Sequence, residues 1–161
     1  MTVEVYLCKF MQKIIMTASI IYEGDYRCLA THLQSNTRIE TDAPTDNRGK
    51  GEKFSPTDLL CVSLATCICT TMAMKATDLG IELKNTKIEV TKHMLSDPRR
   101  VGRVDITLIF DKSLNLKEKD RIMLERTGNN CPVAKSVHPD LELRIMYDWN
   151  GETASELKVS V

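Results

Sequence analysis

Two cysteines in different settings are the residues of this chain with the clearest capacity for chemistry. Cys67 lies deep inside a long apolar stretch that begins near Ser55, whereas Cys131 stands directly before Pro132 at a predicted helix start. A thiol at a helix start faces unpaired N–H groups and the positive end of the helix dipole, which stabilise its thiolate. Cys67 lies about three turns inside its helix, so it needs a cation or a hydrogen-bond donor from elsewhere. The pair favours thiol redox chemistry.

Other uses of these thiols are weighed against that interpretation. A metal site at Cys67 and Cys69 is disfavoured because residues two apart on a helix project about 200° from each other. Acyl transfer by Cys131 and His138 is disfavoured because their helical spacing separates them by about 10 Å along the axis. A role as small core side chains stays open for Cys67 and Cys131. It is the default for the remaining cysteines, Cys8, Cys28, Cys61 and Cys69. No metal and no cofactor is predicted.

The composition is that of one ordinary globular domain. The chain has 161 residues, is 42% hydrophobic and 27% charged, and its 22 basic and 22 acidic side chains leave no net charge. This balance argues against nucleic-acid binding and against attraction to a membrane surface. No apolar run is expected to approach the roughly 18 residues of a membrane span. We expect a single domain over residues 1–161, with 1–13 as a possible N-terminal extension. These first residues do not have the pattern of a signal peptide. We also expect a cytoplasmic location, where cysteines stay reduced unless they serve redox chemistry.

The elements that must position the two thiols follow from hydrophobic periodicity and capping. Ser55, Pro56 and Asp58 predict the start of a long helix that ends near Leu79, before Gly80. The first half of that helix is apolar nearly all round, so the helix is expected to be buried or covered by a partner subunit. A second helix is predicted from a capping box over 115–118 to a stop at residue 128. Strands are predicted at 14–22, 26–33, 37–41, 85–95, 103–111 and 141–149. This order predicts an α+β fold, with antiparallel sheets wrapped around a long central helix.

Two motifs taken together resemble a known family. Gly49–Leu60, which reads GKGEKFSPTDLL and continues to Cys67, is followed far downstream by Asn-Cys-Pro-Val at 130–133. Together they resemble the OsmC/Ohr family of osmotically inducible and organic hydroperoxide resistance proteins, with a matching element order from about Ile14 onward. The resemblance implies an intertwined OsmC-like homodimer with two active sites at the subunit interface. It also implies a cofactor-free, cysteine-based peroxidase that reduces organic hydroperoxides in oxidative stress defence.

The resemblance also implies a role for each thiol. The helix cysteine of the family attacks the peroxide and becomes a sulfenic acid, a role that falls to Cys67. The second cysteine resolves the sulfenic acid into a disulfide, a role that falls to Cys131. A dithiol or a small-molecule thiol would then restore both thiols by exchange.

The start of the long helix departs from the family pattern. Catalytic members typically carry Asn-Pro-Glu there, and that Glu helps to hold an Arg over the reactive thiol. Here the triplet is Ser55-Pro56-Thr57, and the acid is displaced to Asp58. One residue rotates a helical side chain by about 100°, which leaves Asp58 either as that acid or only as a cap. Three arginines are candidates for the cation: Arg27, Arg48 and Arg38. The departure favours an alternative, a non-catalytic OsmC-like protein that binds a small apolar or thiol-reactive ligand.

Overall fold

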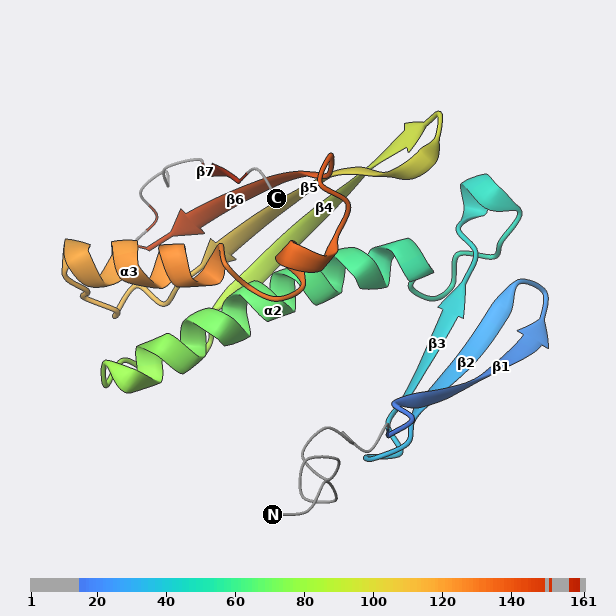
Figure 1. Cartoon of the computed structure of the whole chain (residues 1–161), viewed down its shortest axis with the longest axis horizontal. Coiled ribbons are helices and arrows are strands. Elements are labelled where there is room, and N and C mark those ends of the chain that lie inside the picture. Colours follow the sequence, from blue (N-terminus) through green and yellow to red (C-terminus); the bar gives the residue numbers. More distant parts are fainter. Residues whose placement is uncertain (1–14, 150, 152–156, 160–161) are drawn as a thin grey trace, which may run out of the picture. The chain divides into compact units, whose positions relative to one another are not determined.

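The chain forms two compact units, Met1–Pro56 and Thr57–Val161. The computed structural model describes residues 15–149, 151 and 157–159 (Figure 1). The first unit contains β1 (Ala18–Gly24), β2 (Arg27–His32), β3 (Arg38–Asp42) and the short 3-10 helix η1 (Thr45–Asn47). From the boundary onward come α2 (Pro56–Asp78), β4 (Lys87–Ser96), β5 (Arg99–Ile109), α3 (Glu118–Gly128), the 3-10 helix η2 (Ala134–Ser136), β6 (Glu142–Asp148) and β7 (Leu157–Val159).

The first unit is a three-stranded antiparallel sheet in the order β1-β2-β3. Its register places Ile20 beside Ala30 and Ala30 beside Ile39, so these apolar side chains share one face. The described residues of this unit include only two buried side chains, Asp42 and Ser55, and neither is apolar. The residues of the first unit that the structure describes therefore form no apolar core of their own.

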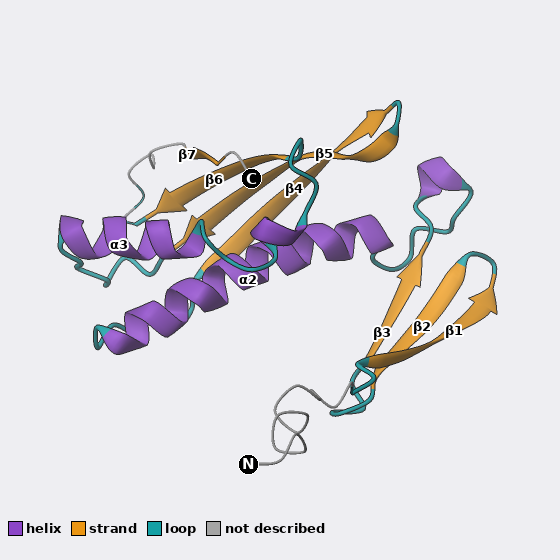
Figure 2. Cartoon of the chain, in the orientation of Figure 1, coloured by secondary structure: helices purple, strands orange, loops and turns teal. Residues whose placement is uncertain are grey.

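The second unit holds the apolar core. Its four-stranded sheet has the order β4-β5-β6-β7, and α2 and α3 lie against one face of it (Figure 2). The sheet contributes alternate residues such as Ile106 of β5 and Ile145 of β6, both fully buried, as alternation along a half-buried strand requires. From α2 the buried side chains are Cys61, Leu64, Ala65, Ile68, Met72 and Ala76, at the spacing of one helix face.

The α+β class with two sheets is confirmed, and three details of the prediction are wrong. The second sheet is mixed, because β6 runs parallel to β5. The α3 segment crosses over between these strands and returns the chain to the same end of the sheet. The strand predicted from residue 103 begins already at Arg99, in a tight hairpin with β4. The predicted capping box at Asn115 does not open α3, whose N-cap is Lys117 without a side-chain cap.

Helix α2 is more apolar than expected. By length and composition alone it could cross a membrane, with a mean hydropathy of 1.7 over an 18-residue window. The expectation that no stretch comes near this limit was therefore wrong. One face of α2 is nevertheless part of the core of the second unit, which identifies it as a core helix.

Hydroxyl side chains on the rest of α2 are turned back onto their own helix. The Oγ1 of Thr66 donates to the carbonyl of Val62 at 2.8 Å, and that of Thr70 donates to the carbonyl of Thr66 at 2.9 Å. Thr77 does the same with Ala73 at 2.9 Å. Such back-bonding gives each hydroxyl hydrogen an acceptor within the helix.

Candidate functional site

The second unit brings the two predicted thiols together. Cys67 of α2 is half-buried, whereas Cys131 follows α3 and is completely buried. The side chain of Cys131 lies close enough to that of Cys67 to interact with it. Both are free thiols. Segments far apart in the sequence thus supply two neighbouring sulfur atoms, as a peroxidatic and resolving pair would require.

The end of α3 determines where Cys131 lies. A Cβ atom on Gly128 would meet Cγ of Met72 at 2.7 Å and Cγ2 of Ile68 at 3.2 Å, so the two helices touch here. Cys131 N–H donates to the carbonyl of Gly128 at 3.1 Å, which ties the cysteine to the end of the helix. Because Ile68 directly follows Cys67, the close approach of α3 to α2 carries Cys131 to the vicinity of Cys67.

Burial raises the pKa of the Cys131 thiol. The N–H of Ala134 donates to its Sγ at 3.4 Å and lowers the pKa, as expected for a thiol at a helix start. The neighbouring Cys67 side chain raises the pKa of Cys131 further. The prediction of a stabilised Cys131 thiolate is therefore wrong, because desolvation outweighs the turn's N–H groups. Cys131 keeps its proton, which suits a resolving thiol better than an attacking one.

Tyr147 and Asn129 support the turn, and sequence reasoning missed both. The buried Tyr147 hydroxyl donates to Oδ1 of Asn129 at 2.6 Å, which fixes the residue two places before Cys131. Burial, with smaller contributions from Glu125 and Cys131, raises the pKa of Tyr147, so the hydroxyl stays neutral. The available signal was the position of Asn129 beside the Asn-Cys-Pro-Val motif.

Arg27, in the first unit, is held by two carboxylates. Its Nε donates to Oδ1 of Asp42 at 2.6 Å, and its Nη2 donates to Oδ2 of Asp42 and to Oε2 of Glu52, each at 2.7 Å. Both carboxylates raise the pKa of Arg27 still further, and Arg27 in turn lowers the pKa of Asp42. Neither acid was predicted, because the pairing of Arg27 with Asp42 depends on the β2–β3 register.

The other two candidate arginines lack such anchors. Arg48 and Arg38 are both exposed, and neither forms an ion pair with any residue in the described part of the chain. Arg48 follows η1 with a positive φ of 64°. Of the three candidates, only Arg27 has its guanidinium fixed by acids.

Asp58 accepts a hydrogen bond from Nζ of Lys92 at 2.6 Å, and Lys92 also donates to Oγ1 of Thr57 at 3.0 Å. Lys92 pairs with Val104 in the β4–β5 register, so it extends from the sheet face that packs on α2. The ion pair ties the first turn of α2 to β4. Lys92 also lies near the buried Cys61, whose pKa is raised chiefly by burial.

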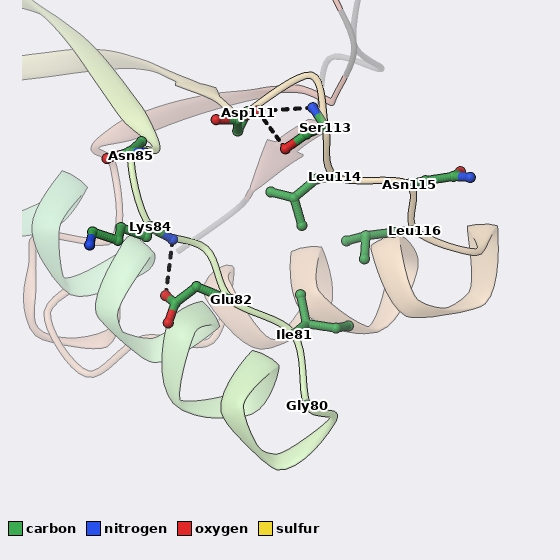
Figure 3. Close-up of a pocket in the computed structure, with 10 residues that line it drawn as sticks. All are labelled: Gly80, Ile81, Glu82, Lys84, Asn85, Asp111, Ser113, Leu114, Asn115 and Leu116. Atoms are coloured by element: carbon green, nitrogen blue, oxygen red, sulfur yellow. Dashed lines mark hydrogen bonds between the residues drawn. The ribbon is translucent and has the colours of Figure 1, made fainter.

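A pocket of about 470 Å³ lies near the C-terminal end of α2 (Figure 3). Ile81, Leu114 and Leu116 form its apolar part, and polar residues such as Glu82 and Asp111 surround them. No cysteine lines this pocket, so it is separate from the thiol pair. The described residues contain no group of His, Cys, Asp and Glu side chains that could hold a metal ion.

The comparisons with known proteins agree with the fold and with both motifs. The family model described as OsmC-like protein matches residues 49–145, which is more than half of the chain. A crystal structure from Psychrobacter arcticus, described as an osmotic stress induced and detoxification response protein, is 48% identical. It covers 83% of this chain and 96% of its own, with a TM-score of 0.79.

Two more distant relatives widen the comparison. A Vibrio cholerae organic hydroperoxide resistance protein, solved with captopril in one of its active sites, is 16% identical with a TM-score of 0.65. The match covers 93% of this chain and 98% of that one. The uncharacterized protein YmaD of Bacillus subtilis is 21% identical over 130 residues, or 77% of this chain and 87% of its own. The chain belongs to the OsmC-like protein family.

Proposed function

We propose that the protein is a cysteine-based peroxidase that reduces organic hydroperoxides. The observation that carries this proposal is the meeting of Cys67 and Cys131 in the second unit, where burial raises the pKa of Cys131. The hydroperoxide resistance proteins among its structural relatives support the same substrate class.

The proposed reaction uses the two thiols in order. The Cys67 thiolate attacks one oxygen of the hydroperoxide, and an S–O bond forms as the O–O bond breaks. The other oxygen takes up a proton and leaves as part of the alcohol. Cys67 is then a sulfenic acid. Cys131 attacks that sulfur, the S–O bond breaks, and water leaves as the Cys67–Cys131 disulfide forms. A dithiol or small-molecule thiol reduces the disulfide by exchange and is itself oxidised.

Arg27 is the cation that we propose for the Cys67 thiolate in the assembled protein. A guanidinium stays charged at any working pH and donates in a fixed plane, so it suits an anionic sulfur. Arg27 is favoured over Arg48 because two carboxylates fix it. For Asp58 we propose a supporting role, in which its ion pair with Lys92 steadies the first turn of the helix that carries Cys67.

A homodimer is part of the proposal. Proteins of the OsmC/Ohr family are typically homodimers. The first unit has no buried apolar side chain among its described residues, and an isolated small sheet needs a covered face to be stable. A partner subunit would supply that cover. We also propose a cytoplasmic location, where a reducing environment keeps the two thiols available.

The test follows cumene hydroperoxide consumption by the reduced protein with dithiothreitol as reductant. The wild type is expected to turn over, Cys67→Ser to be inactive, and Cys131→Ser to accumulate a sulfenic acid on Cys67. Cys69→Ser is the matched control, since Cys69 lies on the same helix and is also half-buried. Mass spectrometry should find a Cys67–Cys131 disulfide after oxidation. Equal consumption by wild type and Cys67→Ser would refute the proposal and favour the non-catalytic ligand-binding alternative.

A further inference from the structure

We propose that Asp42 is the positioning residue of Arg27: it grips one edge of the guanidinium and leaves the opposite edge, Nη1, for the reacting thiolate. This inference rests on the proposed function, in which Arg27 serves Cys67. It names a residue that takes over the task for which the family uses an acid at the start of the long helix.

Arg27 and Asp42 form a bidentate ion pair. Arg27 and Asp42 are direct partners across the β2–β3 ladder. Nε and Nη2 donate to the two oxygens of one carboxylate, at 2.6 and 2.7 Å. Two parallel charge-assisted bonds fix the plane of a guanidinium as well as its position.

Asp42 is itself held in place. Its side chain is only 3% exposed, and it accepts the backbone N–H of Glu52 at 3.1 Å. A carboxylate so deeply buried requires a compensating charge, and Arg27 provides it. The loop before α2 therefore orients Asp42, and Asp42 in turn orients Arg27.

The hydrogen bonds of Arg27 leave one side open. A guanidinium has five N–H donors, of which one is on Nε and two are on each terminal nitrogen. Nε serves Asp42, and Nη2 serves both Asp42 and Glu52. For the two N–H groups of Nη1, the described residues offer no acceptor. A guanidinium with three donors occupied and two directed elsewhere is prepared for an anion.

This anchor does not depend on the first residues of α2. Asp42 ends β3 and Glu52 lies in the following loop, so both belong to the same unit as Arg27. Thr57 can thus stand where catalytic relatives carry Glu without leaving the arginine unsupported.

The test measures the reaction of Cys67 with iodoacetamide over a range of pH in the full reduced protein. Asp42→Asn is expected to slow alkylation by about 10-fold to 100-fold, the range typical of residues that orient a catalytic group, and to move the profile to higher pH. Glu89→Gln is the control, because it makes the same carboxylate-to-amide change on β4 of the second unit, where Glu89 is exposed and pairs with Lys87 at 2.6 Å. It should match the wild type. An Asp42→Asn variant that also matches the wild type would overturn the inference.

A double-variant comparison separates positioning from a purely structural role. Asp42→Asn should have no further effect on alkylation in an Arg27→Ala background, since nothing remains to be positioned. Equal slowing in both backgrounds would overturn the inference. If Asp42→Asn does not fold, as judged by thermal unfolding, Asp42→Glu replaces it. Glu keeps the charge but shifts the carboxylate by one methylene group, so alkylation should be intermediate, and an unchanged rate would contradict the inference.

The outcomes also distinguish this inference from the proposed reaction. Loss of peroxide turnover in every form, with the alkylation differences intact, would refute the peroxidase and support the role of Asp42. Unchanged alkylation in Arg27→Ala would refute both the role of Arg27 and that of Asp42.

Discussion

Cys67 and Cys131 are neighbours in the fold, but they differ in exposure and in hydrogen bonding. The buried Cys131 accepts one backbone N–H, and its burial still raises its pKa above the ordinary 9.0. A thiol that stays protonated is a poor nucleophile toward peroxide. In the proposed reaction it acts only after a sulfenic acid has formed on Cys67, because attack on that acid then closes the disulfide.

This difference predicts the order of alkylation. At about pH 8, below the ordinary pKa of a thiol, iodoacetamide should modify Cys67 well before Cys131 in the folded, reduced protein. Peptide mass spectrometry after timed quenching measures both rates. In urea the two rates should converge, since burial no longer separates the thiols. Preferential modification of Cys131 in the folded protein would contradict the assignment.

The Arg27–Asp42 pair predicts how acid destabilises the protein. The folded state lowers the pKa of Asp42 below its usual 3.8, so the pair stabilises the fold at higher pH. That contribution is lost as the pH falls from about 4 through the lowered pKa. Urea unfolding at a series of pH values should therefore show a smaller acid-induced loss in Asp42→Asn than in the wild type. Identical pH dependence in both would contradict this prediction.

Among the elements, the contact between α3 and α2 matters most for the thiol pair. Gly128 allows it, because a methyl group there would come within 2.7 Å of Met72 Cγ. Gly128→Ala should destabilise the protein by about 1–3 kcal/mol, the usual cost of overpacking a core. Disulfide formation after one equivalent of peroxide should also slow, because Cys131 is moved away from Cys67. Urea unfolding and timed mass spectrometry measure the two effects.

Met72 provides the control for this contact. Met72→Ala removes the two nearest atoms that the new methyl group would meet, Cγ and Sδ, so Gly128→Ala should lower the free energy of unfolding less in that background than in the wild type. If Gly128→Ala lowers the free energy of unfolding equally in both backgrounds, the contact with Met72 does not limit how closely the two helices approach.

The sequence predicted the elements better than it predicted their relations. Helix α2 was expected to begin near Pro56 and to end near Leu79, because proline and glycine act locally on the backbone. The direction of β6 was missed, since alternation reports which face is buried but not which way a strand runs. The Asp42 anchor was missed for a similar reason: it depends on the register of β2 against β3, which no local pattern encodes.

At the scale of the whole molecule, the first unit needs a covering surface. Ile20 and Ile39 share one face of its sheet and are 66% and 46% exposed in the single chain. Exposed apolar surface of this kind marks an interaction site. The proposed homodimer would bury it without requiring a different fold.

Sedimentation velocity provides the test of this proposal. The wild type should sediment as a dimer, and Ile20→Glu should yield monomer or aggregate, because a carboxylate would have to be buried without a partner. Gln34→Glu is the matched control, since it adds the same charge at an exposed turn between β2 and β3. A monomeric wild type would contradict the dimer.

The threonines of α2 affect how easily water can leave that helix. Thr66, Thr70 and Thr77 donate their hydroxyl hydrogens to carbonyls of the same helix, with donor-to-acceptor distances of 2.8 to 2.9 Å. If another surface covered these threonines, no hydroxyl hydrogen would be left without an acceptor. The usual free-energy penalty for burying a polar side chain would therefore be small. Only the hydroxyl oxygens, which can still accept hydrogen bonds, would then distinguish this side of α2 from an apolar one.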